Sequence, residues 1–353
     1  MNSSHTELKQ LDDKLRHEGG RILVIQTAFL GDVILMTPLI AALRKMYPKC
    51  EINLLINKAW ADVISNLVEA VIPIDKNSSR NKSNGLKNLV NKLKGKNFDL
   101  AVIPHRSFRS AYMAKQAGIA HRIGFNKGGG KYLHTIRVDY PQLEYEGKRN
   151  LRLLAPLSDD QMVTKPFLKP SDDDYNVVNE IIKGRKLSDN KYIVIAPGSV
   201  WHTKRWYKNQ YRSFITMLYE IHGIDSFFIG SKDDRELCDK IALNSELNFA
   251  GQLTPLQSCA LIKGSIFSIS GDSAPAHMAT AMNHRQVIIF GSTTSRFGFV
   301  AADENIRCAG IDLWCRPCTN HGRKSCPLIR GNLRCLTEIL PANIYNMVKD
   351  WLQ

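Results

Sequence analysis

The chain has 353 residues, a formal net charge of +15 at pH 7 and a hydrophobic content of 44%. This length exceeds one typical α/β core and predicts two domains of about 150–180 residues each. No apolar run reaches the length of about 18 residues that a transmembrane helix needs. The polar segment 1–20 lacks the apolar centre of a signal peptide. We therefore expect a cytoplasmic protein without a membrane span.

Much of the positive charge lies in two segments, 80–96 and 105–122. An excess of this size predicts an acidic partner, which can be nucleic acid, an anionic lipid surface or a phosphorylated substrate. A solvated basic face is the simpler alternative. Nucleic acid is disfavoured because no aromatic interleaving or known binding motif accompanies the lysines. We expect peripheral contact with the inner face of the cytoplasmic membrane, where anionic glycolipid attracts basic segments.

The first half of the chain predicts a doubly wound parallel sheet, because short apolar strands alternate with amphipathic helices. The segment 1–20 is expected to be a helical or frayed extension. The predicted strands are 22–26, 52–56, 71–74, 100–104 and 123–125. The predicted helices are 37–47, 59–67, 86–93 and 109–117, the first with Thr37 as N-cap and Pro38 as its first residue.

The second half repeats the pattern and predicts a second sheet. Its predicted strands are 192–196, 226–230, 249–250, 265–270 and 287–290, followed by a terminal helix at 341–352. Prolines and an acidic stretch within 155–190 indicate the boundary between the halves. The predicted organisation is an extension (1–20), two Rossmann-like domains (21–175 and 176–340) and a C-terminal helix (341–353). A ligand is expected in the cleft between the domains, at the carboxyl ends of the strands.

The most informative segment is 271–279, Gly-Asp-Ser-Ala-Pro-Ala-His-Met-Ala. It follows a predicted strand and opens an amphipathic segment. A helix N-terminus at that place offers unpaired backbone N–H groups and the positive end of the helix dipole, which both suit a phosphate. Asp272, Ser273 and His277 can add side-chain hydrogen bonds. The segment therefore predicts a phosphorylated ligand.

This segment, extended to GDSAPAHMATAMNHRQVIIFGSTT, resembles the donor-nucleotide motif of the heptosyltransferase family, glycosyltransferase family 9. Three other segments resemble the same family in the expected order. They are RILVIQTAFLGDVILMTPLIAALRKMYP, PHRSFRSAYMAKQAGIAHRIGF and IAPGSVWHTKRWY. The resemblance implies an α/β fold of the GT-B type, with two Rossmann-like, doubly wound parallel-sheet domains facing across a cleft. It assigns the acceptor to the first domain and the donor nucleotide to the second.

The resemblance also implies the activity: an inverting, metal-independent transfer of heptose from ADP-heptose to the inner core of a lipopolysaccharide precursor. Asp32 matches the family's catalytic base, which takes a proton from the acceptor hydroxyl. Lys204 matches the lysine that stabilises the departing diphosphate. The donor-binding residues are then Ser199, Thr203, Lys204, Asp234, Asp272, Ser273, Ala274 and His277. Arg106, Arg109 and Arg122 are expected to bind anionic groups of the acceptor, with His105 and Lys131 as further candidates.

Several of these residues also have simpler interpretations. Asp32 can serve as a helix N-cap, although Thr37-Pro38 already predicts a helix start. Asp234 stands where the family commonly has Glu, so a cap is an equal alternative and Asp233 is a rival. Ala274 replaces a residue that is often Gly, which excludes an easy positive φ. A lone histidine such as His277 commonly serves only to satisfy a helix interior.

Eight cysteines in a cytoplasmic chain are expected to be reduced. Cys50, Cys238, Cys259 and Cys308 are interpreted as buried apolar residues. The other four form C-x2-C-x7-C-x8-C, which is similar to a zinc knuckle but lacks a tight second pair. A structural zinc is therefore possible at Cys315, Cys318, Cys326 and Cys335, and no catalytic metal or cofactor is expected.

Three alternative functions remain at this stage. A nicotinamide-dependent dehydrogenase is disfavoured because the turn after the first strand, 26–31, holds one glycine instead of G-x-G-x-x-G. A non-catalytic module that binds anionic glycolipid would use the positive charge and not need Asp32. A transferase of another nucleotide-activated sugar also fits, because sequence cannot place the few hydroxyl contacts that distinguish one sugar from another.

Overall fold

The computed structural model describes residues 2–75, 82–158, 165–185, 187, 191–328 and 332–352. The chain divides into two compact units, Met1–Pro166 and Phe167–Gln353. The division falls inside the segment 155–190, in which prolines and acidic residues predict a boundary. Each unit is built around its own parallel sheet, as the alternation of strands and helices predicts.

Unit 1 holds a parallel sheet with the strand order β3-β2-β1-β4-β5-β6. Its central strand β1 pairs with β2 on one side and β4 on the other, with Val24 opposite Leu54 and Val102. This is the strand order of a Rossmann fold. The strands are β1 (Arg21–Gln26), β2 (Glu51–Asn57), β3 (Ala70–Ile74), β4 (Leu100–Ile103), β5 (His121–Phe125) and β6 (Ile136–Val138).

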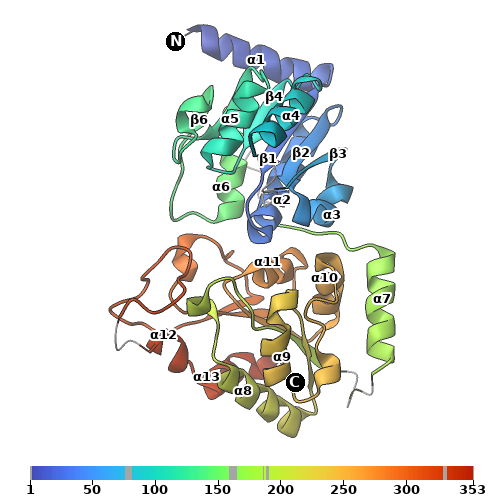
Figure 1. Ribbon diagram of the computed structural model, residues 1–353, viewed down its shortest axis with the longest axis vertical. Helices are drawn as coiled ribbons and strands as arrows, with labels where there is room; N and C mark the ends of the chain where they lie inside the picture. The colour runs from blue at the N-terminus through green and yellow to red at the C-terminus, as the bar shows by residue number, and fades with distance from the viewer. Residues whose placement is uncertain are drawn as a thin grey trace. The chain divides into compact units, whose positions relative to one another are not determined.

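Helices cover both faces of this sheet (Figure 1). Alternate residues of β1 point to opposite faces. Val24 packs with helices α1 (Asn2–His17), α2 (Leu30–Met46) and α6 (Glu146–Arg152), while Leu23 packs with α4 (Lys82–Lys94) and α5 (Phe108–Gln116). Short helical segments complete the unit: η1 (Lys58–Trp60), α3 (Ala61–Ile64), η2 (Ser65–Leu67) and η3 (Lys131–Leu133). The continuous apolar runs of the strands follow from this two-sided burial.

Residues 2–17 were expected to form a helical or frayed extension. They form the helix α1, which buries Leu11 and Leu15 in the core of unit 1. The Tyr47 hydroxyl donates to Asp12 Oδ1 at 2.6 Å and fixes the helix further. The segment is therefore an integral part of the unit.

Unit 2 has the strand order β11-β10-β9-β7-β8, also parallel throughout. Numbered within the unit, this is the flavodoxin-like order 2-1-3-4-5. The strands are β7 (Tyr192–Ala196), β8 (Asp225–Phe228), β9 (Ser268–Gly271), β10 (Gln286–Ile289) and β11 (Ile306–Ala309). Its helices are α7 (Asp172–Lys183), α8 (Lys208–His222), α9 (Arg235–Ile241), α10 (Pro255–Gly264), α11 (Ala274–Ala281), α12 (Arg334–Thr337) and α13 (Pro341–Val348). Single turns lie at η4 (His202–Lys204), η5 (Lys232–Asp234), η6 (Ser245–Leu247), η7 (Ser295–Phe297) and η8 (Lys349–Trp351).

The core of unit 2 contains Trp206. This residue is 2% exposed, packs among the buried side chains of the unit and donates its indole N–H to Ile339 O at 3.0 Å. Trp206 is therefore a core aromatic of unit 2. The terminal helix is present as α13 followed by η8, and its residues Ile344 and Val348 belong to the same core.

One predicted strand is absent: the segment 249–250 forms no strand, and an isolated bridge joins the neighbouring Asn248 to Phe228. The strands β6 and β11 and several helices, among them α6 and α7, were not predicted. A capping box at Ser171 and Asp174 starts α7, so the acidic stretch is the first turn of a helix instead of a linker.

The start of α2 is a further correction. The helix begins at Leu30 and keeps Pro38 in its interior, so Thr37 is not its N-cap. A proline lacks the N–H that would bond the carbonyl four residues earlier, which here is Ile34 O. The Thr37 hydroxyl instead donates to Ile34 O at 2.8 Å. The Thr-Pro pair therefore repairs the helix internally, and Asp32 falls in its first turn.

In the parts of the chain that the structure describes, no helix is both long enough and apolar enough to cross a bilayer.

The repair of α2 can be tested by Thr37→Val. Because Thr37 is fully buried, we expect the unpaired Ile34 carbonyl to lower the free energy of unfolding by about 1–3 kcal/mol. In a Pro38→Ala background the alanine N–H can bond Ile34 O, so Thr37→Val should cost less there. Urea denaturation followed by circular dichroism measures this double-mutant cycle. An equal cost in both backgrounds would contradict the account.

Candidate functional site

Unit 1 has a cavity of about 310 Å³ at the carboxyl ends of β1 and β4. The strand order reverses between these strands, since the chain continues from β1 to β2 on one side and reaches β4 on the other. Ligands of open α/β sheets bind at such a switch point. The cavity is lined by Gln26, Asp32, Pro104, His105, Arg106, Ser107, Gly128 and Glu146.

Asp32 lies in the first turn of α2, is partly exposed and lines this cavity. Its Oδ2 accepts a hydrogen bond from the Phe29 N–H at 3.2 Å. The N-cap residue of α2 is therefore Phe29 and not Asp32, whose carboxylate caps the Phe29 N–H from the third position of the helix and also lines the cavity. A cap of this kind fixes the side chain and leaves it accessible to a ligand in the cavity.

Arg106 is held over an aromatic ring beside the cavity. Its guanidinium carbon lies 4.1 Å from the centre of the Tyr140 ring, and that of Arg149 lies 4.8 Å from the same centre. Such cation–π contacts orient an arginine and leave its N–H groups for anions. His105 also lines the cavity, with Nδ1 at 3.1 Å from Thr27 Oγ1 and 2.9 Å from Ser110 Oγ.

The structure does not bring the other two predicted arginines to the cavity that the described residues form. Arg122 lies on β5 and donates to the carbonyls of Ile119, Ala120 and Leu133. Burial lowers its pKa. Arg122 therefore joins segments of unit 1 together. Arg109 lies in the first turn of α5 and is partly exposed, and Lys131 contacts the ring of Tyr132.

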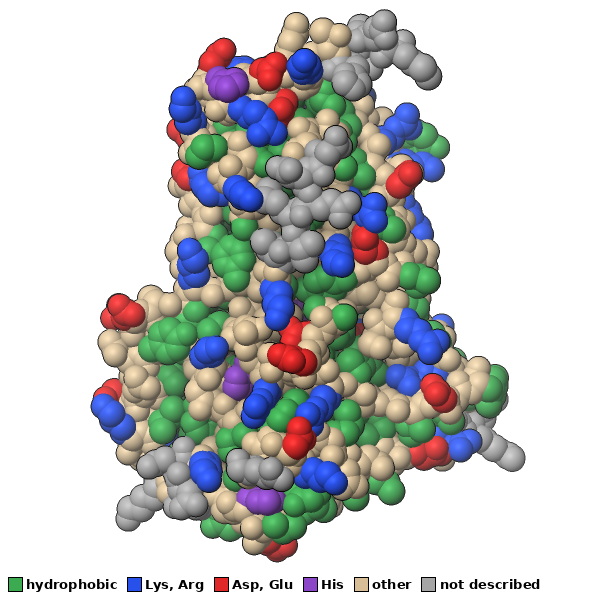
Figure 2. All heavy atoms as spheres, turned by 180° about the vertical axis from the view of Figure 1, so that it is seen from behind, with side chains coloured by type: hydrophobic (Ala, Val, Ile, Leu, Met, Phe, Trp, Pro, Cys, Tyr) green, Lys and Arg blue, Asp and Glu red, His purple; other side chains and the backbone are tan. Residues whose placement is uncertain are grey.

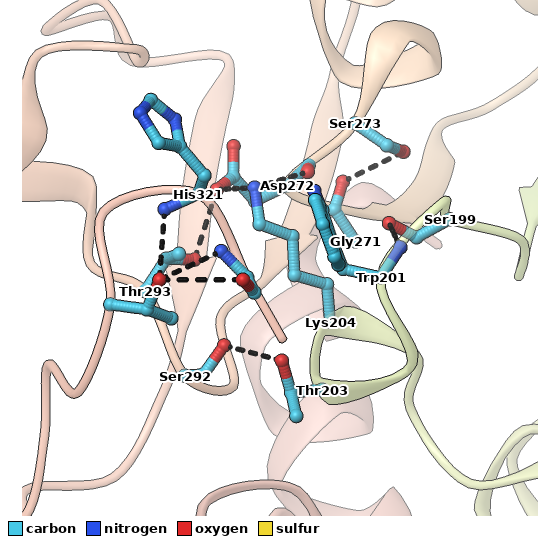
Figure 3. A network of polar contacts seen from close by, with 12 residues as sticks. Ser199, Trp201, Thr203, Lys204, Gly271, Asp272, Ser273, Ser292, Thr293 and His321 are labelled. Carbon is cyan, nitrogen blue, oxygen red and sulfur yellow. Dashed lines mark hydrogen bonds and ion pairs between the residues drawn. The ribbon is translucent and has the colours of Figure 1, made fainter. Parts of the chain in front are cut away.

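In unit 2 a buried ion pair joins Lys204 and Asp272 (Figure 3). Lys204 Nζ donates to Asp272 Oδ2 at 2.7 Å and to the Asp272 carbonyl at 3.2 Å. The Thr293 hydroxyl donates to the same carboxylate oxygen at 2.9 Å. The three residues follow β7, β9 and β10, so the carboxyl ends of three neighbouring strands converge on one polar cluster.

Two glycines make this convergence possible. A Cβ on Gly271 would lie 2.5 Å from the Lys204 carbonyl oxygen, and a Cβ on Gly291 would lie 2.4 Å from the Thr203 carbonyl oxygen. Real side chains do not approach this closely. The backbone of 203–204 therefore packs on the ends of β9 and β10 because both positions lack a side chain.

Thr203 anchors the same turn. Its hydroxyl lies 2.8 Å from Ser292 Oγ and accepts a hydrogen bond from the Arg323 N–H at 2.8 Å. Ser199 lies in the turn after β7, where its hydroxyl accepts from the Trp201 N–H at 3.3 Å and its carbonyl accepts from Arg205 Nε at 2.7 Å. Thr203 is thus a buried structural element beside Lys204, and Ser199 is partly exposed.

The helix α11 starts at Ala274 with Ser273 as its N-cap residue in extended conformation. The Ser273 hydroxyl donates to the Gly271 carbonyl at 3.4 Å. His277 lies within α11 and is 7% exposed. Burial lowers the pKa of His277 to about 4; the Asp272 charge opposes this shift and the Lys204 charge adds to it. The imidazole is therefore neutral at pH 7, so it can hydrogen-bond an anion without adding charge.

Asp234 lies against the turn that follows β7. Its Oδ2 accepts from the Ser231 N–H at 2.9 Å and from the Ser231 hydroxyl at 2.6 Å, which is a capping box. A Cβ on Gly198 would lie 2.2 Å from Asp234 Cγ. Asp234 therefore completes the capping box of η5, in which Ser231 is the N-cap residue, and it also lies against the turn that contains Ser199.

Comparisons with known proteins decide the family. The sequence profile of Glycosyltransferase family 9 (heptosyltransferase) matches residues 86–328. The chain belongs to glycosyltransferase family 9. It is 26% identical over 300 residues to lipooligosaccharide heptosyltransferase 2 of Haemophilus ducreyi, an alignment that covers 78% of this chain and 85% of the relative.

Two solved structures have the same fold as this glycosyltransferase. The glycosyl transferase family 9 protein of Veillonella parvula has a TM-score of 0.82 and 18% identity, covering 94% of this chain and 97% of that one. The E. coli ADP-heptose lps heptosyltransferase II has a TM-score of 0.76 and 23% identity, covering 94% and 98%. The predicted fold class, two Rossmann-like parallel-sheet domains of the GT-B type, is confirmed.

The structure also places the four cysteines that the sequence offers for a possible structural zinc. Among the described residues, no group of three or more His, Cys, Asp or Glu side chains is placed to hold a metal ion. Cys315, Cys318, Cys326 and Cys335 are free, partly exposed thiols. Cys50, Cys238 and Cys259 are buried as predicted, whereas Cys308 is exposed, so its interpretation as a buried residue was wrong.

Sequence reasoning missed Tyr140, Glu146 and Arg149 in unit 1. Glu146 and Arg149 are spaced i, i+3 in a polar segment, which suggests an ordinary surface pair. The structure buries both, with 8% and 1% of their surface exposed. Two charged residues in a helix that packs against α2 would have indicated a buried charged pair. The sequence of the segment does not reveal that packing.

Proposed function

We propose that this glycosyltransferase moves heptose from ADP-heptose to the inner core of a lipopolysaccharide precursor, with inversion at the anomeric carbon. Two observations on relatives support the choice of substrates: the H. ducreyi relative is named a lipooligosaccharide heptosyltransferase, and the E. coli neighbour an ADP-heptose lps heptosyltransferase. Unit 2 holds the donor nucleotide, and unit 1 holds the acceptor and supplies the base.

The observation that carries the proposal is the cluster at the end of β7, β9 and β10. Lys204 Nζ, the N-terminus of α11 and the Thr293 hydroxyl converge around Asp272. A lysine and helix N–H groups at the carboxyl end of parallel strands suit a diphosphate. Lys204 has 11% of its side chain exposed, so its charge acts in a water-poor environment, where it stabilises a leaving anion strongly.

The proposed reaction is a single displacement. Asp32 takes the proton of an acceptor hydroxyl, and the oxygen attacks the anomeric carbon of heptose from the face opposite the diphosphate. The bond from that carbon to the diphosphate oxygen breaks, and ADP leaves with its electron pair. Lys204 stabilises the negative charge of the diphosphate, so the step needs no metal ion. Ser199, Asp234, Ser273, Ala274 and His277 are proposed to bind the nucleotide and its phosphates.

On the acceptor side, Arg106 is the arginine that the geometry favours. It lines the cavity that also contains Asp32, and its fork suits a carboxylate or phosphate. Arg109 can contribute from the start of α5. Arg122 is a weaker candidate, because backbone carbonyls already accept from its guanidinium.

Asp32→Asn tests the base directly. We expect acceptor-dependent ADP release from ADP-heptose to fall by about two to four orders of magnitude, because the amide cannot accept the proton. ADP is measured with a coupled assay, and binding of ADP alone should be unchanged. Asp62→Asn is the matched control, since Asp62 is an exposed aspartate in the first turn of another helix of unit 1. Undiminished release by Asp32→Asn would move the base elsewhere.

We also propose peripheral contact of unit 1 with an anionic membrane surface. Lys and Arg side chains are spread over the face of both units drawn in Figure 2, with Asp and Glu among them. Along the chain the excess is concentrated in residues 82–138, where Asp99 is the single acidic residue. Their basic residues are Lys82, Lys87, Lys92, Lys94, Lys96, Arg106, Arg109, Lys115, Arg122, Lys127, Lys131 and Arg137.

The exposed side chains of this region support the proposal of a lipid contact. Asp99 is turned to α1, where it pairs with Lys14 at 2.6 Å. Phe108 and Tyr132 expose 56% and 77% of their surface beside this basic region. Lys131 lies 4.8 Å above the Tyr132 ring. Aromatic rings among lysines are suited to the boundary between anionic headgroups and acyl chains.

Vesicle binding tests this contact. Lys87→Glu, Lys92→Glu and Lys94→Glu together should weaken binding to vesicles of mixed phosphatidylcholine and phosphatidylglycerol by at least about tenfold, since each lysine near the surface contributes about 1 kcal/mol. The control changes three exposed lysines of unit 2, Lys191, Lys208 and Lys349, to Glu. An equal loss of vesicle binding in both variants would contradict a contact through unit 1. Vesicle binding that does not respond to salt would contradict an electrostatic contact.

A further inference from the structure

The cavity of unit 1 contains a second carboxylate, that of Glu146. The residue is the first of α6 and is 8% exposed. The helix is fixed to α2 by the buried Asn150, whose Nδ2 donates to the Leu35 carbonyl at 3.1 Å. This contact brings the first turns of α2 and α6 to one cavity, which Asp32 and Glu146 both line.

Glu146 is held by a chain of cationic and aromatic groups. Its Oε2 lies 2.5 Å from Arg149 Nη2, and the Arg149 side chain is 2% exposed. Arg149 Nη1 in turn donates to the Tyr140 hydroxyl at 2.7 Å and to the Gln142 carbonyl at 3.0 Å. The Tyr140 ring then supports Arg106 at 4.1 Å. A chain of contacts through Arg149 and Tyr140 therefore connects the Glu146 carboxylate to Arg106.

We propose that Glu146 is a positioning residue for the reaction: its charge strengthens Asp32 as a base, and through Arg149 and Tyr140 it sets the place of Arg106. This inference rests on the proposed role of Asp32. Two carboxylates that line one cavity disfavour each other's ionisation. A carboxylate that holds its proton more tightly is the better base toward a sugar hydroxyl.

The charges of the cavity act on Glu146 in both directions. The pKa of Glu146 is raised: burial is the largest cause and the charge of Asp32 adds to it, whereas Arg149, Arg106 and a hydrogen bond with Tyr140 oppose the shift. The interaction between two charges is reciprocal, so the charge of Glu146 acts on Asp32 in the same sense. The groups that face the pair are Arg149 from α6, His105 and Arg106 after β4, and Tyr140 after β6.

A buried ion pair of this kind costs more desolvation than an apolar pair of the same volume. In a purely structural role, an apolar pair would suit the contact between α2 and α6 equally well. The Glu146–Arg149 pair lines or adjoins the cavity that contains Asp32. Its electric field therefore acts on the reacting groups there, which an apolar pair would not do.

Glu146→Gln tests the inference, because it keeps the shape and removes the charge. Asp32 must be ionised to act, so the acidic limb of the profile of kcat/KM against pH reports its pKa. We expect Glu146→Gln to move that limb to lower pH by about half a unit to one unit and to lower the plateau of kcat roughly tenfold. Glu146→Asp should keep the position of the limb.

The control is Glu144→Gln. Glu144 lies two residues away and forms the ion pair with Arg152, whose side chain is more than half exposed. This variant should leave the pH profile unchanged. The inference would be overturned if the acidic limb of stably folded Glu146→Gln coincided with that of the unsubstituted enzyme. In that case Asp32→Asn would still abolish ADP release, so the proposed function would stand. Full activity of Asp32→Asn would instead overturn the proposed function.

Discussion

The candidate site of each unit depends on one constraint, which is that the carboxyl ends of neighbouring parallel strands must meet where the strand order reverses. In unit 2 this meeting requires the backbone of 203–204 to press against Gly271 and Gly291, where any Cβ would clash. The close approach buries Lys204 against Asp272 and places both at the N-terminus of α11. Without the two glycines the cluster could not form, and Lys204 would not lie at the place that we propose for the diphosphate of the donor.

Both units bury charge at their sites, and burial of charge has a cost in stability. An ion pair in a poorly solvated place is weak as a stabilising device, because desolvation offsets the attraction between the charges. The Lys204–Asp272 pair of unit 2 and the Glu146–Arg149 pair of unit 1 are both nearly inaccessible. We propose that both pairs are explained by their effect on a ligand, to which they present oriented charge in a site with little water.

The parallel sheets and the loops of the candidate sites were predicted well from the sequence, whereas the first residues of the helices were predicted less well. Strands such as β1 and β7 were readable because two-sided burial makes them continuous apolar runs, and the segment after β9 was readable because small residues follow such a run. The start of α2 was misread because Thr37-Pro38 has the composition of an N-cap, whereas the Thr37 hydroxyl repairs the helix from within. Glu146 and Arg149 were missed because only the packing of α6 on α2 reveals that this charged pair is buried. Arg122 shows the reverse case, since its position fits the family pattern but its guanidinium serves the backbone.

We propose that the polar cluster of unit 2 holds the diphosphate of the donor. This is tested by a crystal structure of the protein with ADP bound. We expect the diphosphate within hydrogen-bond distance of Lys204 Nζ and of the backbone N–H groups at Ser273 and Ala274, with the Lys204–Asp272 distance lengthened as the phosphate takes up part of the lysine's charge. ADP bound elsewhere on unit 2, with the ion pair and the start of α11 untouched, would contradict the account.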